Sequence, residues 1–389
     1  MDTAVQPMTA RAGLAAYQDA LDALEAKSRL RTLAPRAGLD FTSNDYLGLA
    51  SSPRLREAVA AALARGTAIG AGGSRLLRGN TEEHEALETA AAQFFHAERA
   101  LYFGGGYVAN FALFSTLPQT EDLVVLDALS HASAYEGARA GRAKFVHARH
   151  NDLSAFETEI RAWRVLGGRG RVWIGVESLY SMDGDRAPIN ELMALADRHE
   201  AQLVIDEAHA TGVFGPDGRG LAASLEGREN VLVLHTCGKA LGGHGALVSG
   251  PGVLCDFLIN RCRPFIYATA PSPLMAVAAL EAIEILRDEP ERRERLAHLV
   301  SVALEAARMR EVTLGSDSHI LPMIVGDDRR ALMLARALRA RGFDVRAVRP
   351  PSVPEGTARL RISITLNVDE RAICGLFEAL AEEWRALAP

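Results

Sequence analysis

Lysine is scarce in this chain of 389 residues: it occurs only at positions 27, 144 and 239, although lysine and arginine together number 43. Arginine therefore carries nearly all of the positive charge. A guanidinium group stays protonated, whereas a buried lysine loses its proton readily and can then act as an amine. A lysine kept in a buried setting is a candidate for amine chemistry, while an exposed one is ordinarily a snorkelling surface side chain.

Several other features are sparse or missing. The four cysteines show no C-x-x-C spacing, so we expect neither a metal site nor a disulfide framework. No apolar run approaches the ~20 residues of a membrane span, and the N-terminus lacks the apolar core of a signal peptide. The formal net charge of -6 argues against sequence-independent binding of nucleic acid. Together these features predict a cytoplasmic protein with reduced, mostly packed thiols that binds neither membrane nor nucleic acid.

The chain has enough apolar sequence for a large core, because 48% of its residues are hydrophobic. Strand-like apolar runs that alternate with helical patterns indicate a mostly parallel sheet with helices on both faces. Continuous apolar character fits strands that are buried on both sides. The sequence therefore predicts an α/β fold, with strands at 100–103, 123–126, 144–147, 172–176, 202–205, 231–234 and 246–249.

Helical patterns flank this region. Residues 9–32 predict an amphipathic helix, whose apolar face holds Leu14, Tyr17, Leu21 and Leu24. Beyond residue 290 a smaller α+β unit is expected. We therefore expect an N-terminal helix and arm over 1–45, a large α/β domain over 46–288 and a small C-terminal domain over 289–389. Helices are predicted at 53–65, 81–98, 272–287, 290–309, 328–341 and 368–386, and C-terminal strands at 320–325, 343–348 and 360–364.

Lys239 follows one of the apolar runs and precedes a glycine-rich turn. Asp206 ends the preceding run, and His209 lies three residues later. The carboxyl ends of parallel strands are where α/β sheets hold ligands. A lysine and a carboxylate there suit pyridoxal phosphate, which requires a Schiff-base lysine and an acidic partner for its pyridine nitrogen. A helix N-cap followed by a first-turn histidine would explain Asp206 and His209 equally well.

A glycine run, Gly104-Gly105-Gly106, is followed by Tyr107 and stands between a predicted strand and a helical pattern. Backbone N–H groups at a helix N-terminus bind phosphate, and glycine lets the phosphate approach. Thr236, three residues before Lys239, could add a hydroxyl. A tight turn, a core tyrosine and an ordinary strand-end threonine are the alternatives, since the spacing matches no established phosphate loop.

Two further polar groups follow predicted strands. His131 could stack on a cofactor ring and shuttle protons, although a lone histidine is more often a hydrogen-bonded loop residue. Ser181 could bond a phenolic oxygen of the cofactor, although Ser, Asp and Gly in this segment also suit a simple turn.

Taken together, these segments resemble the α-oxoamine synthases, which are fold-type I pyridoxal-phosphate enzymes. The resemblance runs from about residue 40 to the C-terminus. It implies a fold-type I transferase with a large, mostly parallel-sheet domain and a smaller C-terminal α+β domain. The motifs, in the family's order, are S-N-D-Y-L-G-L, G-x-G-G-S-R, G-x-x-A-N, L-S-H-A-S, S-M-D-G-D, D-E-A-H-x-T-G, T-x-G-K and the segment 349–363.

The resemblance also implies roles for individual residues. Lys239 would hold the cofactor and exchange the proton at the substrate's Cα, while Asp206 would bond the ring nitrogen. His131 would stack on the ring. The remaining implied roles are as follows: His209 and Ser181 at the phenolic oxygen; Gly106, Tyr107 and Thr236 at the phosphate; Asn44 and Arg361 at the substrate carboxylate; Arg349 in substrate binding; Arg31 and Ser352 at the acyl-substrate entrance; and Ser74 and Thr269 at the partner's cofactor in a homodimer.

The segment from Arg349 to Arg361 resembles the branch of the family that condenses L-alanine with a pimeloyl thioester, on CoA or acyl carrier protein, in biotin biosynthesis. A relative that uses glycine or serine is one alternative. A non-catalytic member is another, although such chains typically lose the lysine. The chain departs from the family between Arg31 and Asn44, where it lacks the usual β-hairpin, and at Cys237, where relatives often have a larger apolar residue.

Overall fold

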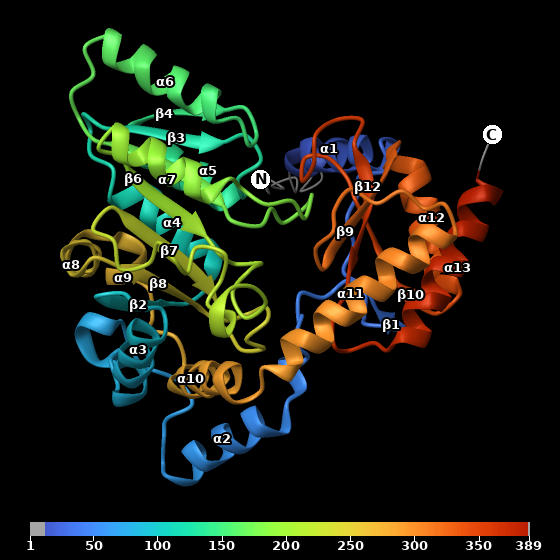
Figure 1. The fold of residues 1–389 in the computed structure, drawn as a ribbon, viewed down its shortest axis with the longest axis horizontal. Helices are drawn as coiled ribbons and strands as arrows, with labels where there is room; N and C mark the ends of the chain where they lie inside the picture. Colours follow the sequence, from blue (N-terminus) through green and yellow to red (C-terminus); the bar gives the residue numbers. More distant parts are fainter. Residues whose placement is uncertain (1–11, 388–389) are drawn as a thin grey trace, which may run out of the picture.

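A seven-stranded sheet dominates the computed structural model, which describes residues 12–387 (Figure 1). The strand order is β2-β8-β7-β6-β5-β3-β4. Neighbours from β4 to β7 run parallel, and β8 is antiparallel to both β7 and β2. All seven predicted apolar runs are therefore strands of one mostly parallel sheet. The strands are β2 (Arg99–Phe103), β3 (Leu123–Asp127), β4 (Lys144–Ala148), β5 (Val172–Glu177), β6 (Gln202–Asp206), β7 (Val231–Thr236) and β8 (Ala246–Gly250).

Helices cover both faces of this sheet, as the continuous apolar strands require. Along β3, Leu123 and Val125 join the core cluster that contains α6 and α7, while Val124 and Leu126 join the cluster that contains α4, α5 and α8. Successive strand residues point to opposite faces, so a strand covered on both sides is apolar at every position. The helices are α4 (Gly106–Thr116), α5 (Ala132–Ala140), α6 (Leu153–Val165), α7 (Ile189–Arg198), α8 (Gly252–Arg261) and α9 (Arg263–Ile266).

The C-terminal part forms a separate three-stranded antiparallel sheet with the order β11-β12-β9. The segment predicted as one strand over 343–348 forms two short strands, β10 and β11, which belong to different sheets. The residue between them, Val345, is buried. The expected domain boundaries stay a prediction. The elements are β9 (Ile320–Gly326), β10 (Phe343–Asp344), β11 (Arg346–Val348), β12 (Ala358–Ser363), α11 (Glu291–Met309), α12 (Asp328–Ala340) and α13 (Glu370–Ala386).

The segments before β2 connect the two parts. β1 (Leu39–Asp40) pairs in parallel with β10, which attaches the N-terminal arm to the C-terminal part. In place of the family's hairpin, residues 29–37 contain no regular element. The helix α10 packs on α2 and α3, which come from the first part of the chain. These elements are α2 (Pro53–Ala64), α3 (Glu82–Phe94), α10 (Pro273–Asp288) and the short turns η2 (Leu49–Ser51), η3 (Arg75–Gly79) and η4 (Pro216–Gly218).

The N-terminal helix is shorter than predicted. A single 3-10 turn, η1 (Ala12–Leu14), leads into α1 (Ala15–Ala26), and residues 9–11 of the predicted helix lie outside the described residues. Its apolar stripe is exposed rather than packed, since Leu14 and Tyr17 are 63% and 70% exposed and Leu21 and Leu24 are 46% and 37% exposed. No described helix is both long and apolar enough to cross a lipid bilayer. All four cysteines are free thiols, and only Cys374 is partly exposed.

Candidate active site

A cavity of about 250 Å³ opens at the carboxyl ends of β5, β6 and β7. Three strand-end residues, Glu177, Asp206 and Thr236, lie in its wall because parallel strands bring their carboxyl ends to one edge of the sheet. Seven of the predicted residues line this one cavity: Gly106, Tyr107, His131, Asp206, His209, Thr236 and Lys239.

Lys239 extends its amine toward His209. The Nζ of Lys239 lies 2.7 Å from Nε2 of His209, and Nδ1 of His209 lies 2.6 Å from the hydroxyl of Tyr46. Desolvation lowers the pKa of Lys239 to about 8, although the nearby carboxyl groups of Asp206 and Glu177 act to raise it. Burial, reinforced by Lys239, holds the pKa of His209 well below its usual value. His209 is therefore a neutral ring that positions the amine.

Asp206 is buried and held in a fixed orientation. Asn110 Nδ2 donates to Oδ2 of Asp206 over 2.7 Å, and the Ala208 backbone N–H donates to Oδ1 over 2.9 Å. The chain after Asp206 forms a series of turns, so the alternative of a helix N-cap followed by a first-turn histidine is wrong. These two donors fix the Asp206 carboxylate and leave its other lone pairs free. The carboxylate is therefore suited to accept a hydrogen bond from a cationic ring nitrogen.

The glycine run ends where α4 begins. Gly105 is the N-cap and Gly106 the first helical residue, so the first backbone N–H groups of α4 have no intrahelical partner. A Cβ on Gly106 would lie 2.6 Å from Cγ2 of Thr236, which is closer than real side chains approach. Thr236 lines the same cavity. Only glycine at position 106 allows Thr236 to pack this closely against the N-terminus of α4. The threonine hydroxyl and the free N–H groups of the helix together suit a phosphate.

His131 is a hydrogen-bonded residue at the start of a helix, and its role at a cofactor ring stays a prediction. It is the N-cap of α5, and its Nδ1 accepts the Ser133 backbone N–H over 3.3 Å and lies 2.7 Å from the Ser133 hydroxyl. It is thus a hydrogen-bonded loop histidine that also lines the cavity. Because Nδ1 accepts from the backbone, the neutral ring carries its proton on Nε2.

Arg361 links the small sheet to the loop after β5. It is only 7% exposed; its Nε donates to the Ser181 carbonyl over 2.6 Å, and one terminal nitrogen lies 3.4 Å from the Tyr46 hydroxyl. That hydroxyl also donates to Oδ1 of Asn44 over 2.9 Å. Asn44 and Arg361, which were predicted at the substrate carboxylate, are thus joined through Tyr46.

A second cavity, of about 430 Å³, adjoins the first at His131. Ser181 and Ser352 line it together with Met182 and Val353. Ser181 is therefore placed in the second cavity and not among the residues that line the first. Ser352 and His131 line the same cavity, and the role of Ser352 at an acyl-substrate entrance stays a prediction.

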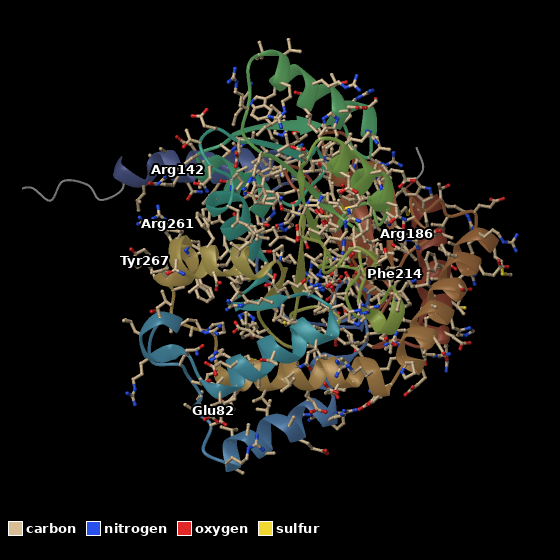
Figure 2. The ribbon with its side chains drawn as sticks, turned by 60° about the vertical axis from the view of Figure 1, so that its left-hand side comes forward. Glu82, Arg142, Arg186, Phe214, Arg261 and Tyr267 are labelled. Atoms are coloured by element: carbon tan, nitrogen blue, oxygen red, sulfur yellow. The ribbon has the colours of Figure 1, made fainter. Side chains whose placement is uncertain are left out.

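Six predicted residues line neither cavity: Asn44 and Arg361, whose contacts are given above, and Arg31, Arg349, Ser74 and Thr269. Arg31 is exposed, and Arg349 donates to the Ser28 carbonyl. Ser74 and Thr269 lie on segments that a hydrogen bond from Ala270 N to Gly73 O, 2.9 Å long, holds together. The neighbouring Tyr267 is exposed at the outer surface near Arg261 (Figure 2). The roles of all six residues stay predictions.

Three residues of the site were not predicted: Tyr46, Asn110 and Glu177. Two of them lie within motifs that the sequence singled out, S-N-D-Y-L-G-L and G-x-x-A-N, at positions given no role. Glu177 could have been found as the polar end of a buried strand next to that of Asp206.

Comparison with known proteins agrees with this geometry. The family model "Aminotransferase class I and II" matches residues 36–379. An 8-amino-7-oxononanoate synthase from Anaeromyxobacter dehalogenans is 42% identical over 95% of both chains, and one from Chromobacterium violaceum is 43% identical over 85% of both.

Solved structures of similar proteins cover nearly the whole chain. A serine palmitoyltransferase from S. paucimobilis with bound PLP and myriocin superposes with a TM-score of 0.87 at 28% identity, covering 97% of this chain and 98% of that chain. An 8-amino-7-oxononanoate synthase from Francisella tularensis gives a TM-score of 0.74 at 28% identity, covering 90% of this chain and 98% of that chain. This chain belongs to the aminotransferase class I and II family and, within it, to the α-oxoamine synthases.

Proposed function

We propose that this protein is a pyridoxal-phosphate-dependent acyltransferase of biotin biosynthesis. It condenses L-alanine with a pimeloyl thioester to give 8-amino-7-oxononanoate, carbon dioxide and the free thiol. The observation that carries the proposal is the Lys239 amine, 2.7 Å from His209, in one cavity with the fixed carboxylate of Asp206. Relatives about 42% identical over most of the chain bear the name of this activity.

The residues present fit the cofactor. Lys239 would hold its aldehyde carbon, Asp206 its ring nitrogen, and the N-terminus of α4 with Thr236 its phosphate. When bound, this cofactor withdraws electrons from the amino acid's Cα, so that a proton can leave that carbon.

Lys239 Nζ moves that proton. A general base works best when its pKa lies near the working pH, and the pKa of about 8 leaves a useful share of neutral amine. The neutral His209, fixed by Tyr46, holds the amine in place. Lys239 therefore takes the Cα proton and later returns one to the product.

The remaining side chains orient the two substrates. Arg361 and Asn44 bind the alanine carboxylate, which aligns the Cα–H bond for removal. His131 donates from Nε2 to the acyl carbonyl oxygen, stabilising the charge that develops when the new carbon–carbon bond forms. The second cavity, with Ser352 and Val353, receives the acyl chain.

The proposal includes a homodimer with shared sites, in which Ser74 and Thr269 reach the partner's cofactor. Both residues lie on neighbouring segments, and neither lines a cavity of its own chain. The acyl carrier is CoA or acyl carrier protein.

A product assay with L-alanine and pimeloyl-CoA, and in parallel pimeloyl-acyl carrier protein, tests the proposal. We expect 8-amino-7-oxononanoate from the wild type and none above background from Lys239→Ala, together with loss of the visible absorbance of the lysine-bound cofactor. Lys144→Ala, at an exposed lysine, is the matched control and should behave as the wild type. Turnover and absorbance that persist in Lys239→Ala would refute the central assignment.

A serine- or glycine-using synthase is the second candidate, because the serine palmitoyltransferase structures superpose well. The same assay with glycine and serine, and with succinyl- and palmitoyl-CoA, separates the two. A strong preference for any of these pairs over alanine and the pimeloyl thioester would contradict the alanine assignment.

A further inference from the structure

Glu177 is a buried carboxyl group that the proposed mechanism does not use. It ends β5, directly beside Asp206 at the end of β6, since the two residues are paired across these parallel strands. It is 3% exposed and lines the cavity that also contains Lys239. Glu177 therefore reaches the reacting region from a strand to which no role is assigned.

The two carboxyl oxygens of Glu177 differ in their surroundings. Oε2 accepts the Ser181 backbone N–H over 3.0 Å. Oε1 is buried and has no hydrogen-bond partner among residues 12–387. A buried polar atom without a partner costs about 1–3 kcal/mol, so such an atom in a native protein is explained by a ligand, an ordered water or a catalytic role. Asp206, by contrast, uses both of its oxygens to accept hydrogen bonds.

The charge of Glu177 follows from its neighbours. Burial and the adjacent Asp206 carboxylate raise the pKa of Glu177 to about 8, although Lys239 opposes the shift. Two adjacent buried carboxyl groups avoid being ionised together. At neutral pH Glu177 is thus mostly a carboxylic acid, and the unpartnered Oε1 can carry its proton as a hydrogen-bond donor.

We propose that Glu177 is an uncharged cofactor-binding acid that donates a hydrogen bond from Oε1 to the phenolic oxygen of pyridoxal phosphate. This inference rests on the proposed function, because it requires the cofactor on Lys239. The ring nitrogen is assigned to Asp206, and a second donor is most useful at the anionic oxygen on the ring. Glu177 suits the phenolic oxygen because its Oε2 accepts a hydrogen bond from Ser181. Ser181 is one of the residues that the family resemblance assigns to that oxygen.

Two variants separate the donor from the bulk of the side chain. Glu177→Gln keeps an acceptor for Ser181 and a neutral donor, whereas Glu177→Met keeps the length and removes both. We expect the dissociation constant of pyridoxal phosphate to stay within about threefold in Glu177→Gln and to rise about tenfold in Glu177→Met, which is the size of one hydrogen bond. The pH midpoint of the bound cofactor's absorbance should move in Glu177→Met and stay in Glu177→Gln.

Infrared difference spectra of the cofactor-free protein test the charge directly. Wild type minus Glu177→Gln at pH 7 should show the carbonyl band of a protonated acid; carboxylate bands in its place would overturn the proposal. Equal losses of affinity in both variants, or none in either, would also overturn it. If the wild type binds the cofactor and makes product while the Glu177 variants contradict the expectation, only this inference fails. If the wild type does not bind the cofactor, both proposals fail.

Discussion

At the scale of single residues, Gly106 makes the clearest steric demand in the site. A Cβ there would lie 2.6 Å from Cγ2 of Thr236. In Gly106→Ala, Thr236 and the start of α4 must therefore move apart, at a cost of about 1–3 kcal/mol. We expect cofactor affinity to fall at least tenfold while the protein stays folded, as measured by equilibrium dialysis of the cofactor and by circular dichroism.

Gly104→Ala is the matched control, because a Cβ on Gly104 meets no atom within 4 Å. It tests whether any added methyl group in the glycine run disturbs the cofactor. Unchanged affinity in Gly106→Ala, or equal losses in both variants, would show that Gly106 is not needed for close packing against Thr236.

Several predicted residues of the cavity share a feature that two of the missed residues, Tyr46 and Asn110, lack. Lys239, Asp206 and Gly106 follow strand-like runs, and the carboxyl ends of parallel strands meet at one edge. Tyr46 and Asn110 act through contacts across 163 and 96 residues of sequence, with His209 and Asp206 respectively. Such distant contacts have no local pattern, so only the folded chain reveals them.

At the scale of elements, His150 connects three loops around the site. Its Nδ1 and Nε2 each lie 2.8 Å from a carboxylate, those of Asp127 and Asp185. Although burial opposes the charged ring, these hydrogen bonds raise the pKa of His150 to about 10. Because the folded value exceeds the unfolded value of 6.5, the stabilisation is complete below about pH 6.5 and is lost as the pH rises toward 10.

We therefore expect His150→Gln to lower the free energy of unfolding by about 1–3 kcal/mol at pH 6.5 and by progressively less up to pH 10. Thermal unfolding of both proteins across this range measures the difference. His147→Gln, at an exposed histidine of β4, is the control. A difference that is constant or grows with pH would contradict a charged His150.

The helices and strands also differ in how well the sequence predicts them. Strands of the central sheet are mostly apolar because helices cover both faces, and all seven were predicted. The edge strand β4 departs from this pattern, since its Lys144 and His147 are exposed. The predicted strand over 343–348 is interrupted because β10 pairs with β1 and β11 with β12. For α1, the sequence predicts an apolar face but not what covers it, and within the described chain that face is exposed.

At the scale of the whole molecule, the site joins distant parts of the chain. Arg361 on β12 reaches the Ser181 carbonyl, 180 residues earlier, and Arg359 on the same strand pairs with Asp183 over 2.5 Å. With a side chain only 3% exposed, Arg359 depends strongly on this partner. The small sheet is thus fixed to the loop after β5, which places the predicted carboxylate-binding residues beside the cavity of Lys239.

The proposed homodimer makes a prediction at this scale too. If Thr269 reaches the partner's cofactor, Thr269→Asp places a negative charge beside the partner's phosphate and inactivates that site, while Lys239→Ala inactivates its own. A heterodimer of the two variants then carries both changes in one site and leaves the other intact. Mixing the inactive variants under conditions that exchange subunits should restore about a quarter of wild-type activity, since half of the dimers are mixed and each has one intact site.

Subunit exchange must be verified in the same samples, with differently tagged chains and co-purification. Mixed Lys239→Ala and Lys239→Gly variants serve as the control and should stay inactive, because every site then lacks its amine. Verified exchange without recovered activity would contradict shared sites and would leave Thr269 within the site of its own chain. Recovered activity would mean that each complete site contains residues of two chains. That result would agree with the position of Thr269, which lines neither cavity of its own chain.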